Sequence, residues 1–185
     1  MRQVLPHGVK DHRLVEKLTK VEHELVSDVL SSDALSKDWP RAWAEVADDR
    51  LALARAHLAA AEWMATSCRD GCWDPGGRSV ISRAYYAMFC AARAAVSLES
   101  NADENDHRKL PGVLGRTTTL GSADERGTVV GALYRFRGAR NDADYSAYYP
   151  KPLEDDATAA LGAARQVLDV CQQWVDEIKR KRGLQ

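Results

Sequence analysis

The sequence predicts an all-α protein. Apolar residues recur every three or four positions along most of the 185 residues, which is the spacing of one face of a helix. No segment shows the alternation of a half-buried strand, and no hairpin turn joins two such segments. The last apolar stripe also begins with acidic residues and ends with basic ones, as the helix dipole favours. We therefore expect an antiparallel bundle of four to five helices with an N-terminal helical extension.

Length and composition are those of an ordinary globular protein. One domain with one core fits 185 residues, an apolar fraction of 45% and a charged fraction of 29%. The formal net charge of −1 argues against a chain that coats nucleic acid nonspecifically, so any polyanion site must be local. The longest apolar run is too short to span a membrane, and the N-terminus lacks the apolar core of a signal peptide. We expect a cytoplasmic protein without a membrane partner.

The first 38 residues differ from the rest of the pattern. Leucines and valines repeat along a narrow apolar edge over residues 9–30, and the run Ser31-Ser32-Asp33 ends the repeat. We expect residues 1–38 to form a helical extension that packs on the domain or on a partner. Residues 39–183 are then expected to form the bundle domain.

The four cysteines do not predict a metal site. Cys68 and Cys72 have the spacing of half a zinc site, but no second pair of ligands follows them. Cys90 and Cys171 fall in apolar helical stripes. We expect ordinary thiols, no metal and no cofactor.

A long alanine-rich stripe over residues 43–65 predicts the first core helix. Arg50 and His57 lie in this stripe, and we interpret His57 as a partly buried structural histidine. The Asp-Pro-Gly-Gly run at residues 74–77 is a strong turn signal. The connection to the next helix is therefore predicted over residues 68–77.

The second core helix is predicted over residues 79–97. Alanines separate the large residues of its broad apolar face, so other helices can approach it closely. Tyr85 and Tyr86 point in different directions on such a helix. We expect at most one of them in the core and the other at an interface or cleft; the alternative is that both are structural.

Start and stop signals divide the rest of the chain into a loop, a short segment and two more helices. An acidic loop over residues 101–106 is followed by a short segment that His107 opens and Pro111-Gly112 closes. The capping box of Ser122 and Glu125 starts the third core helix, and Pro152 starts the last helix. The last helix ends in the basic run over residues 179–182. The helix dipole explains this run without RNA.

One arginine in the third core helix indicates a functional site. A stripe of apolar residues passes through it: Val129, Leu133, Phe136, Arg140, Ala143 and Ala147. An unpaired guanidinium is costly to bury, so Arg140 is expected to face a carboxylate, a partner subunit or a phosphate. This stripe and the small residues of the 79–97 helix also predict a homodimer, because a lone small bundle would leave such a surface exposed.

Polar side chains surround Arg140 at helical spacing. Asp144 lies one turn after Arg140 and can pair with it, while Asn141 and Tyr145 form a second pair on a neighbouring face. Two adjacent polar pairs suit the wall of a cleft. We expect Arg137, Asp144, Tyr148 and His107 to contribute to substrate binding at the same site, His107 if its loop folds over the cleft.

Two segments resemble the HEPN family of small antiparallel helical bundles found in prokaryotic defence and toxin–antitoxin systems. The run from Ser82 to Ala94, Ser-Arg-Ala-Tyr-Tyr-Ala-Met-Phe-Cys-Ala-Ala-Arg-Ala, is similar to the second-helix signature of the family, and His107 follows where many members carry a histidine. The run from Arg140 to Tyr145, Arg-Asn-Asp-Ala-Asp-Tyr, resembles the family's second motif. Tyr145 stands where active members commonly have histidine, and another branch of the family ends this motif in Ala-Asp-Tyr.

The resemblance implies RNA chemistry without a metal. Family members that cut RNA act as dimers whose paired motifs face each other across a shared cleft. By this resemblance Arg140 would hold the scissile phosphate and stabilise negative charge, and Asn141 would orient the ribose or phosphate. A tyrosine side chain, with a pKa of about 10 in model peptides, accepts a proton less readily than histidine at neutral pH.

Two functions follow from these observations. The first is an RNA- or nucleotide-binding component of a toxin–antitoxin or defence system, acting as a metal-independent endoribonuclease with Arg140, Asn141 and Tyr145 in the catalytic site. The second is a noncatalytic HEPN module that binds RNA, a nucleotide or a cognate nucleotidyltransferase antitoxin. A scaffold without either role is the third alternative.

Overall fold

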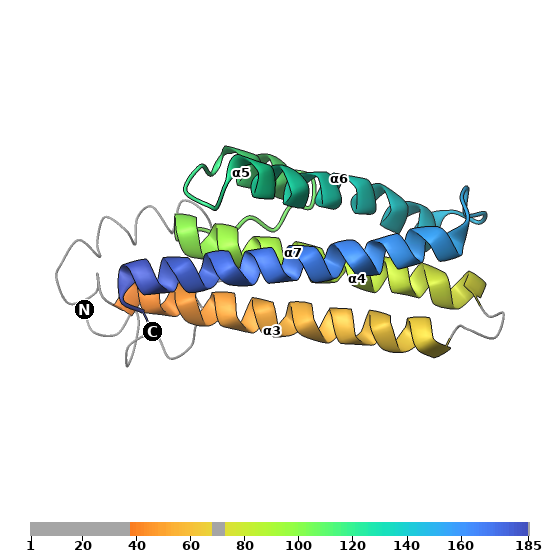
Figure 1. Cartoon of the computed structure of the whole chain (residues 1–185), viewed down its shortest axis with the longest axis horizontal. Coiled ribbons are helices and arrows are strands. Elements are labelled where there is room, and N and C mark those ends of the chain that lie inside the picture. Colours follow the sequence, from red (N-terminus) through yellow and green to blue (C-terminus); the bar gives the residue numbers. More distant parts are fainter. Residues whose placement is uncertain (1–37, 68–72, 185) are drawn as a thin grey trace.

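The computed structural model describes residues 38–67 and 73–184, which form five helices. They are α3 (Asp38–Ser67), α4 (Trp73–Ser100), α5 (Leu110–Arg116), α6 (Ala123–Tyr145) and α7 (Leu153–Arg182). The helices α3 and α6 run in one direction and α4 and α7 in the other, so the predicted all-α antiparallel bundle is confirmed (Figure 1). The helix predicted over residues 9–30 and the pair Cys68 and Cys72 lie outside the described residues. The division of the chain at residue 38 stays a prediction.

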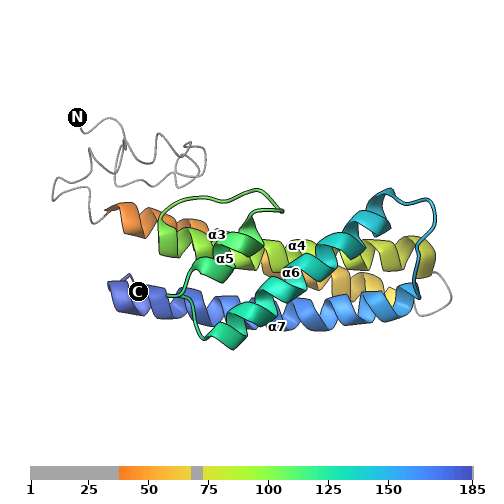
Figure 2. The same cartoon turned by 90° about the horizontal axis from the view of Figure 1, so that it is seen from above.

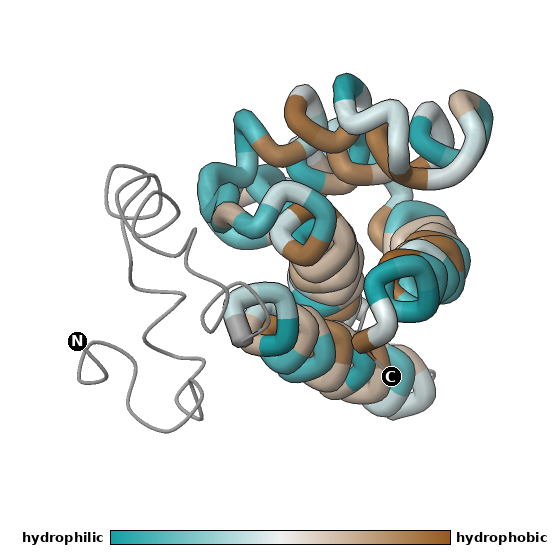
Figure 3. Tube along the Cα trace, turned by 90° about the vertical axis from the view of Figure 1, so that its left-hand side faces the viewer, coloured by the Kyte–Doolittle hydropathy of each residue, from teal (hydrophilic) through white to brown (hydrophobic). Residues whose placement is uncertain are grey.

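The bundle is organised around α4. The long helices α3, α4 and α7 lie side by side, while α6 crosses α4 and α7 obliquely and carries α5 beside it (Figure 2). Seen from one end, the apolar residues face inward and the polar residues face outward (Figure 3). Since α4 contacts each of the other four helices, side chains on its different faces meet different partners.

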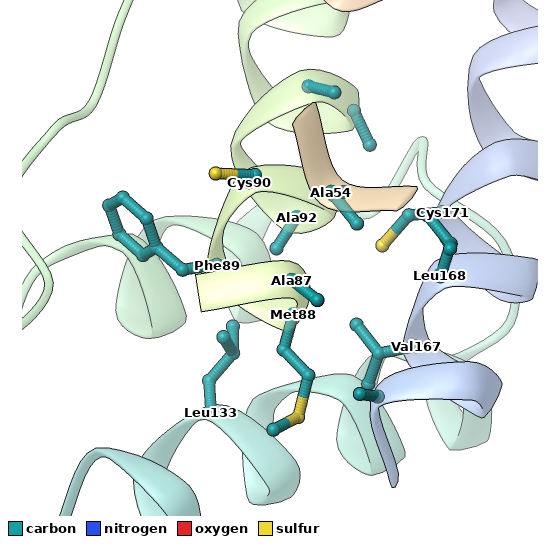
Figure 4. Packing of buried hydrophobic residues seen from close by; sticks show 14 of the residues in the cluster. Ala54, Ala87, Met88, Phe89, Cys90, Ala92, Leu133, Val167, Leu168 and Cys171 are labelled. Atoms are coloured by element: carbon teal, nitrogen blue, oxygen red, sulfur yellow. The ribbon is translucent and has the colours of Figure 1, made fainter. Parts of the chain in front are cut away.

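The central position of α4 depends on its small residues. Its alanines at positions 84, 87, 91, 92, 94 and 95 are completely buried. Methyl groups let three neighbouring helices approach on different sides, and Met88 fills the space between Leu133 of α6 and Val167 of α7 (Figure 4). We had expected these small residues to offer a surface for a second subunit. That expectation is wrong, because helices of the same chain cover them.

Two boundaries differ from the prediction for the same reason. The connection predicted over residues 68–77 ends earlier, because α4 begins at Trp73 and includes Pro75 in its first turn. Pro111 likewise lies at the start of α5, where a closing turn was expected. The first-turn N–H groups of a helix have no partner within the helix, so a proline costs little there.

A buried ion-pair cluster holds the loop between α4 and α5. The Arg50 Nη2 atom of α3 lies 2.9 Å from Asp103 Oδ1, and the Arg93 Nε–H of α4 donates to the same oxygen at 2.7 Å. Arg93 also contacts the second carboxylate oxygen of Asp103. This cluster fixes the loop that carries His107 onto two helices.

The remaining helix ends follow the sequence closely. Ser122 and Glu125 form the predicted capping box at the start of α6. The basic run at the end of α7 is used within the fold: Lys179 contacts Asp48, Lys181 pairs with Glu177 at 2.8 Å, and Arg182 pairs with Glu99 at 3.0 Å. These contacts offset much of the positive charge of the run.

Candidate functional site

Arg140 is held between two aromatic rings near the end of α6. Its guanidinium carbon lies 5.3 Å from the centre of the Tyr86 ring and 5.2 Å from that of Tyr145. The Arg140 Nη2 atom donates to the Tyr86 hydroxyl at 2.7 Å, and Nη1 donates to the Asn141 side-chain oxygen at 3.1 Å. The side chain keeps 18% of its surface exposed, so the guanidinium is ordered and still accessible.

Asp144 compensates the charge of Arg140, as its spacing predicted. The Arg140 Nε atom lies 2.7 Å from Asp144 Oδ2, as an ion pair whose direction does not suit a hydrogen bond. The Ser82 hydroxyl of α4 bonds to the other carboxylate oxygen of Asp144. Asp144 therefore links the cation on α6 to the wall formed by α4.

Asn141 and Tyr145 contact the guanidinium of Arg140. Asn141 is exposed, and Tyr145 and Tyr148 retain 74% and 82% of their surface. The apolar stripe through Arg140 was expected to continue to Ala147. That expectation is wrong, because α6 ends at Tyr145 and Ala147 is exposed.

His107 and Arg137 lie close to Arg140 but are packed against the core. The His107 ring stacks on Phe89 at 3.7 Å between centres, and its Nδ1 atom is 2.8 Å from the Tyr85 hydroxyl. Arg137 Nη1 donates to the His107 carbonyl oxygen at 3.5 Å. Burial lowers the pKa of His107, and the positive charge of Arg140 lowers it further. The imidazole is therefore neutral at pH 7.

The two tyrosines of α4 separate as their positions predicted. Tyr85 is 1% exposed, and its burial raises the pKa of its phenol to about 12 against the opposing charges of Arg137 and Arg140. Tyr86 is half-buried and borders a pocket. Tyr86 lies in the segment that resembles a known helix signature. Its hydrogen bond to Arg140 could not be predicted from local spacing, because the two residues are 54 positions apart.

A pocket of about 710 Å³ lies beside Tyr86. Its walls come from α3, α4 and the end of α6, and they comprise His57, Met64, Arg78, Ser79, Ser82, Arg83, Tyr86, Ala143 and Asp144. His57, which we had interpreted as structural, therefore faces a cavity. Its pKa is lowered by burial and by the charge of Arg83.

Arg78 fixes the end of α6 against α4. Its guanidinium donates to the carbonyl oxygens of Ala143, Ser146 and Ala147 at 3.3, 2.7 and 3.4 Å. The last carbonyl groups of a helix have no partner within the helix, and a cation there also interacts favourably with the negative end of the helix dipole. Sequence reasoning missed this contact, because Arg78 sits next to a Gly-Gly pair that indicated only a turn.

The described residues do not suggest a metal centre or a membrane segment. Within residues 38–67 and 73–184, no three His, Cys, Asp or Glu side chains are grouped as metal ligands. No helix in the same ranges has the length and apolar character needed to cross a bilayer.

The fold and site define an all-helical bundle with an ordered, accessible arginine at the end of its third long helix. The family model of the HEPN domain matches residues 76–174, which is more than half of the chain. This protein belongs to the HEPN domain family. Curated proteins gave no match. The matched range contains both segments that suggested the family and begins after α3.

Proposed function

We propose that this HEPN-family protein binds RNA or nucleotides through Arg140 and is a component of a prokaryotic toxin–antitoxin or defence system. The observation that carries the proposal is the state of the Arg140 guanidinium. Its hydrogen bonds to Asn141 and Tyr86 use one N–H on each terminal nitrogen, and its Nε atom forms the ion pair with Asp144. Each terminal nitrogen keeps one further N–H, and such a pair suits two phosphate oxygens.

The proposed unit is a homodimer that meets along α6. The exposed face of α6 carries one stripe with alternating spacings of four and three: Gly127, Gly131, Tyr134, Gly138, Asn141 and Tyr145. An added Cβ at any of the three glycines would meet no atom within 4 Å. Each glycine costs a helix about 1 kcal/mol relative to alanine. Close approach of a second chain would explain why glycine occupies these exposed positions. A two-fold axis there brings two copies of Asn141 and Tyr145 together.

The proposed activity is metal-independent cleavage of RNA. Arg140 binds the scissile phosphate and stabilises the negative charge that develops on it, while Asn141 orients the ribose or phosphate. Tyr145 completes the catalytic site, and Arg137, Tyr148 and His107 border the bound strand. Asp144 keeps Arg140 in position when no substrate is bound.

The alternative is a noncatalytic module that binds a cognate nucleotidyltransferase antitoxin. The high exposure of the Tyr145 phenol favours this alternative, because a partner enzyme can reach it without unfolding α6. Replacement of Tyr145 by phenylalanine separates the two functions. It removes any modification of the phenol and leaves the fold and the Arg140 contacts in place.

RNA binding and cleavage test the proposal directly. Purified full-length protein is incubated with labelled total RNA in chelator, beside Arg140→Ala and the control Lys181→Gln in the basic run. We expect Arg140→Ala to lower RNA affinity at least about tenfold, since a charge-assisted bond contributes about 1.5–3 kcal/mol. Lys181→Gln should change it less than about twofold. Loss of RNA binding in Lys181→Gln with full binding in Arg140→Ala would contradict the proposal and place the RNA site at the C-terminal basic run.

Light scattering tests the dimer. Gly131→Glu places a charged side chain on the proposed contact and should give monomers. Gly162→Glu is a matched control, because Gly162 is also exposed on a helix and an added Cβ would meet nothing there. A wild-type protein that is monomeric at micromolar concentration rules out the shared cleft.

A further inference from the structure

The pocket beside Tyr86 combines aromatic, apolar and hydroxyl surface. Tyr86 and His57 form an aromatic pair with ring centres 5.6 Å apart and planes inclined by 29°. Met64 and Ala143 add apolar surface, and the Ser82 hydroxyl lies beside them. A volume of about 710 Å³ falls in the range of about 300–1,000 Å³ typical of small-molecule sites.

The imidazole of His57 in this pair is held in its neutral form. Arg83 Nη1 lies 3.5 Å from His57 Nδ1, and a guanidinium can only donate, so the proton of this imidazole is on Nε2. Burial and the Arg83 charge keep the ring neutral by lowering its pKa. The two rings offer flat surface on which a nucleobase can stack, a contact that tolerates any base.

Arg83 supplies a cation on the same wall. It is exposed, and its only contact with another described side chain is the long one with His57. No carboxylate of the described residues pairs with it. A phosphate that enters the pocket would therefore meet a positive charge that the fold has not already compensated.

The pocket adjoins the Arg140 site. Tyr86 contributes to both, because its ring borders the pocket and its hydroxyl accepts a bond from Arg140. Asp144 is also shared, as it lines the pocket and pairs with Arg140. Tyr86 and Asp144 therefore place the pocket next to Arg140.

We propose that this pocket is a subsite for one nucleotide, in which the base stacks on Tyr86 and His57 and the phosphate contacts Arg83. This inference rests on the proposed function at Arg140 and adds the chemistry of the adjacent ligand unit. The shared chemistry is a nucleoside monophosphate, which is either a free molecule or one unit of an RNA strand.

Competition binding with the wild-type chain tests the subsite. A fluorescein-labelled RNA of about ten nucleotides is bound to the full-length protein in chelator, and its anisotropy is followed while AMP or ribose 5-phosphate is added. We expect AMP to displace the RNA at a concentration at least about fivefold lower than ribose 5-phosphate, because base stacking contributes about 1–3 kcal/mol. Equal potency of the two competitors overturns the subsite, and this arm needs no variant.

Variants then locate the binding. Arg83→Gln and His57→Leu should each weaken AMP at least about threefold, whereas Arg116→Gln, an exposed arginine of α5 that does not line the pocket, should not. Circular dichroism and thermal melts confirm that each variant is folded. Unchanged AMP affinity in both folded pocket variants also overturns the proposal.

The outcomes separate the subsite from the function on which it rests. Loss of RNA binding in Arg140→Ala with no effect of AMP or of Arg83→Gln leaves the proposed function standing and removes the subsite. Binding of AMP alone, measured by calorimetry, without any binding of RNA keeps the pocket as a free-nucleotide site and removes RNA as the ligand. No binding of either overturns both.

Discussion

Two arginines of this chain carry the same sequence signal and have different structural environments. Arg50 and Arg140 each fall in an apolar helical stripe, and each pairs with an aspartate, at 2.9 and 2.7 Å. The Arg50 and Asp103 side chains are 5% and 8% exposed, whereas Arg140 and Asp144 are 18% and 27% exposed. The first pair is enclosed and the second lies at a pocket.

The difference follows from where the partner lies in the sequence. Asp103 is 53 residues after Arg50 and also binds Arg93, so this cluster joins two helices to a loop. Asp144 is one turn after Arg140 on the same helix, and the pair adds little to the fold. A partner supplied by the same helix leaves the arginine available for a ligand.

The largest effect is expected at the enclosed cluster. Asp103→Ala removes the buried carboxylate that Arg50 and Arg93 share, which should destabilise the protein by about 3–5 kcal/mol. Urea unfolding followed by circular dichroism measures this. Asp144→Ala is the matched change at the exposed cluster and should cost about 1 kcal/mol or less. Equal losses in the two variants would remove the distinction drawn between the clusters.

A smaller effect is expected from adding a base to the exposed cluster. If the Arg140 site cleaves RNA and is limited by its proton acceptor, Tyr145→His places an imidazole that titrates near neutral pH beside the guanidinium. RNA cleavage in chelator should rise at least about tenfold, at the low end of general-base contributions. Unchanged cleavage in Tyr145→His, with binding still dependent on Arg140, would favour the noncatalytic module.

The smallest effect concerns His107, which connects the two clusters. Asp103 fixes its loop, and the charge of Arg140 acts on its ring. Because burial and then Arg140 lower its pKa below 6.5 in the folded chain, the unfolded chain binds more protons below that pH. Stability should be unaffected above pH 6.5 and fall as the pH drops from 6.5 through the folded pKa.

Urea unfolding between about pH 7.5 and pH 5 follows this dependence. His107→Gln should flatten the acid side of the curve in part, while His57, whose pKa is also lowered, continues to contribute. A variant with the same slope as the wild type would show that His107 has an ordinary pKa in the folded state.

The sequence predicted the parts of the fold and site that depend on local spacing. The Ser122–Glu125 capping box and the Arg140–Asp144 pair lie within a turn or two of the same helix, so their geometry follows from periodicity. The start of α4 was predicted incorrectly, because Pro75 is tolerated in a first turn as well as in a loop.

Contacts between distant segments were beyond sequence reasoning. Tyr86 reaches Arg140, and Arg78 reaches the carbonyl groups at the end of α6, only because α4 and α6 run in opposite directions and cross near these residues. His57 lines the pocket from a third helix. Such positions depend on packing angles that no periodicity specifies.

The alanines of α4 also limit how this chain can diverge in evolution. A methyl group sets the distance between α4 and each neighbour, and a larger residue at a buried position such as Ala84 or Ala91 would push whole helices apart at a cost of about 1–3 kcal/mol. Tyr86 stands on α4 and Arg140 on α6, so any such drift would also lengthen the 2.7 Å bond between them. Exposed residues on the outer faces of α3 and α7 can change without moving the helices. A change in the buried face of α4 alters the core and the Arg140 site at the same time.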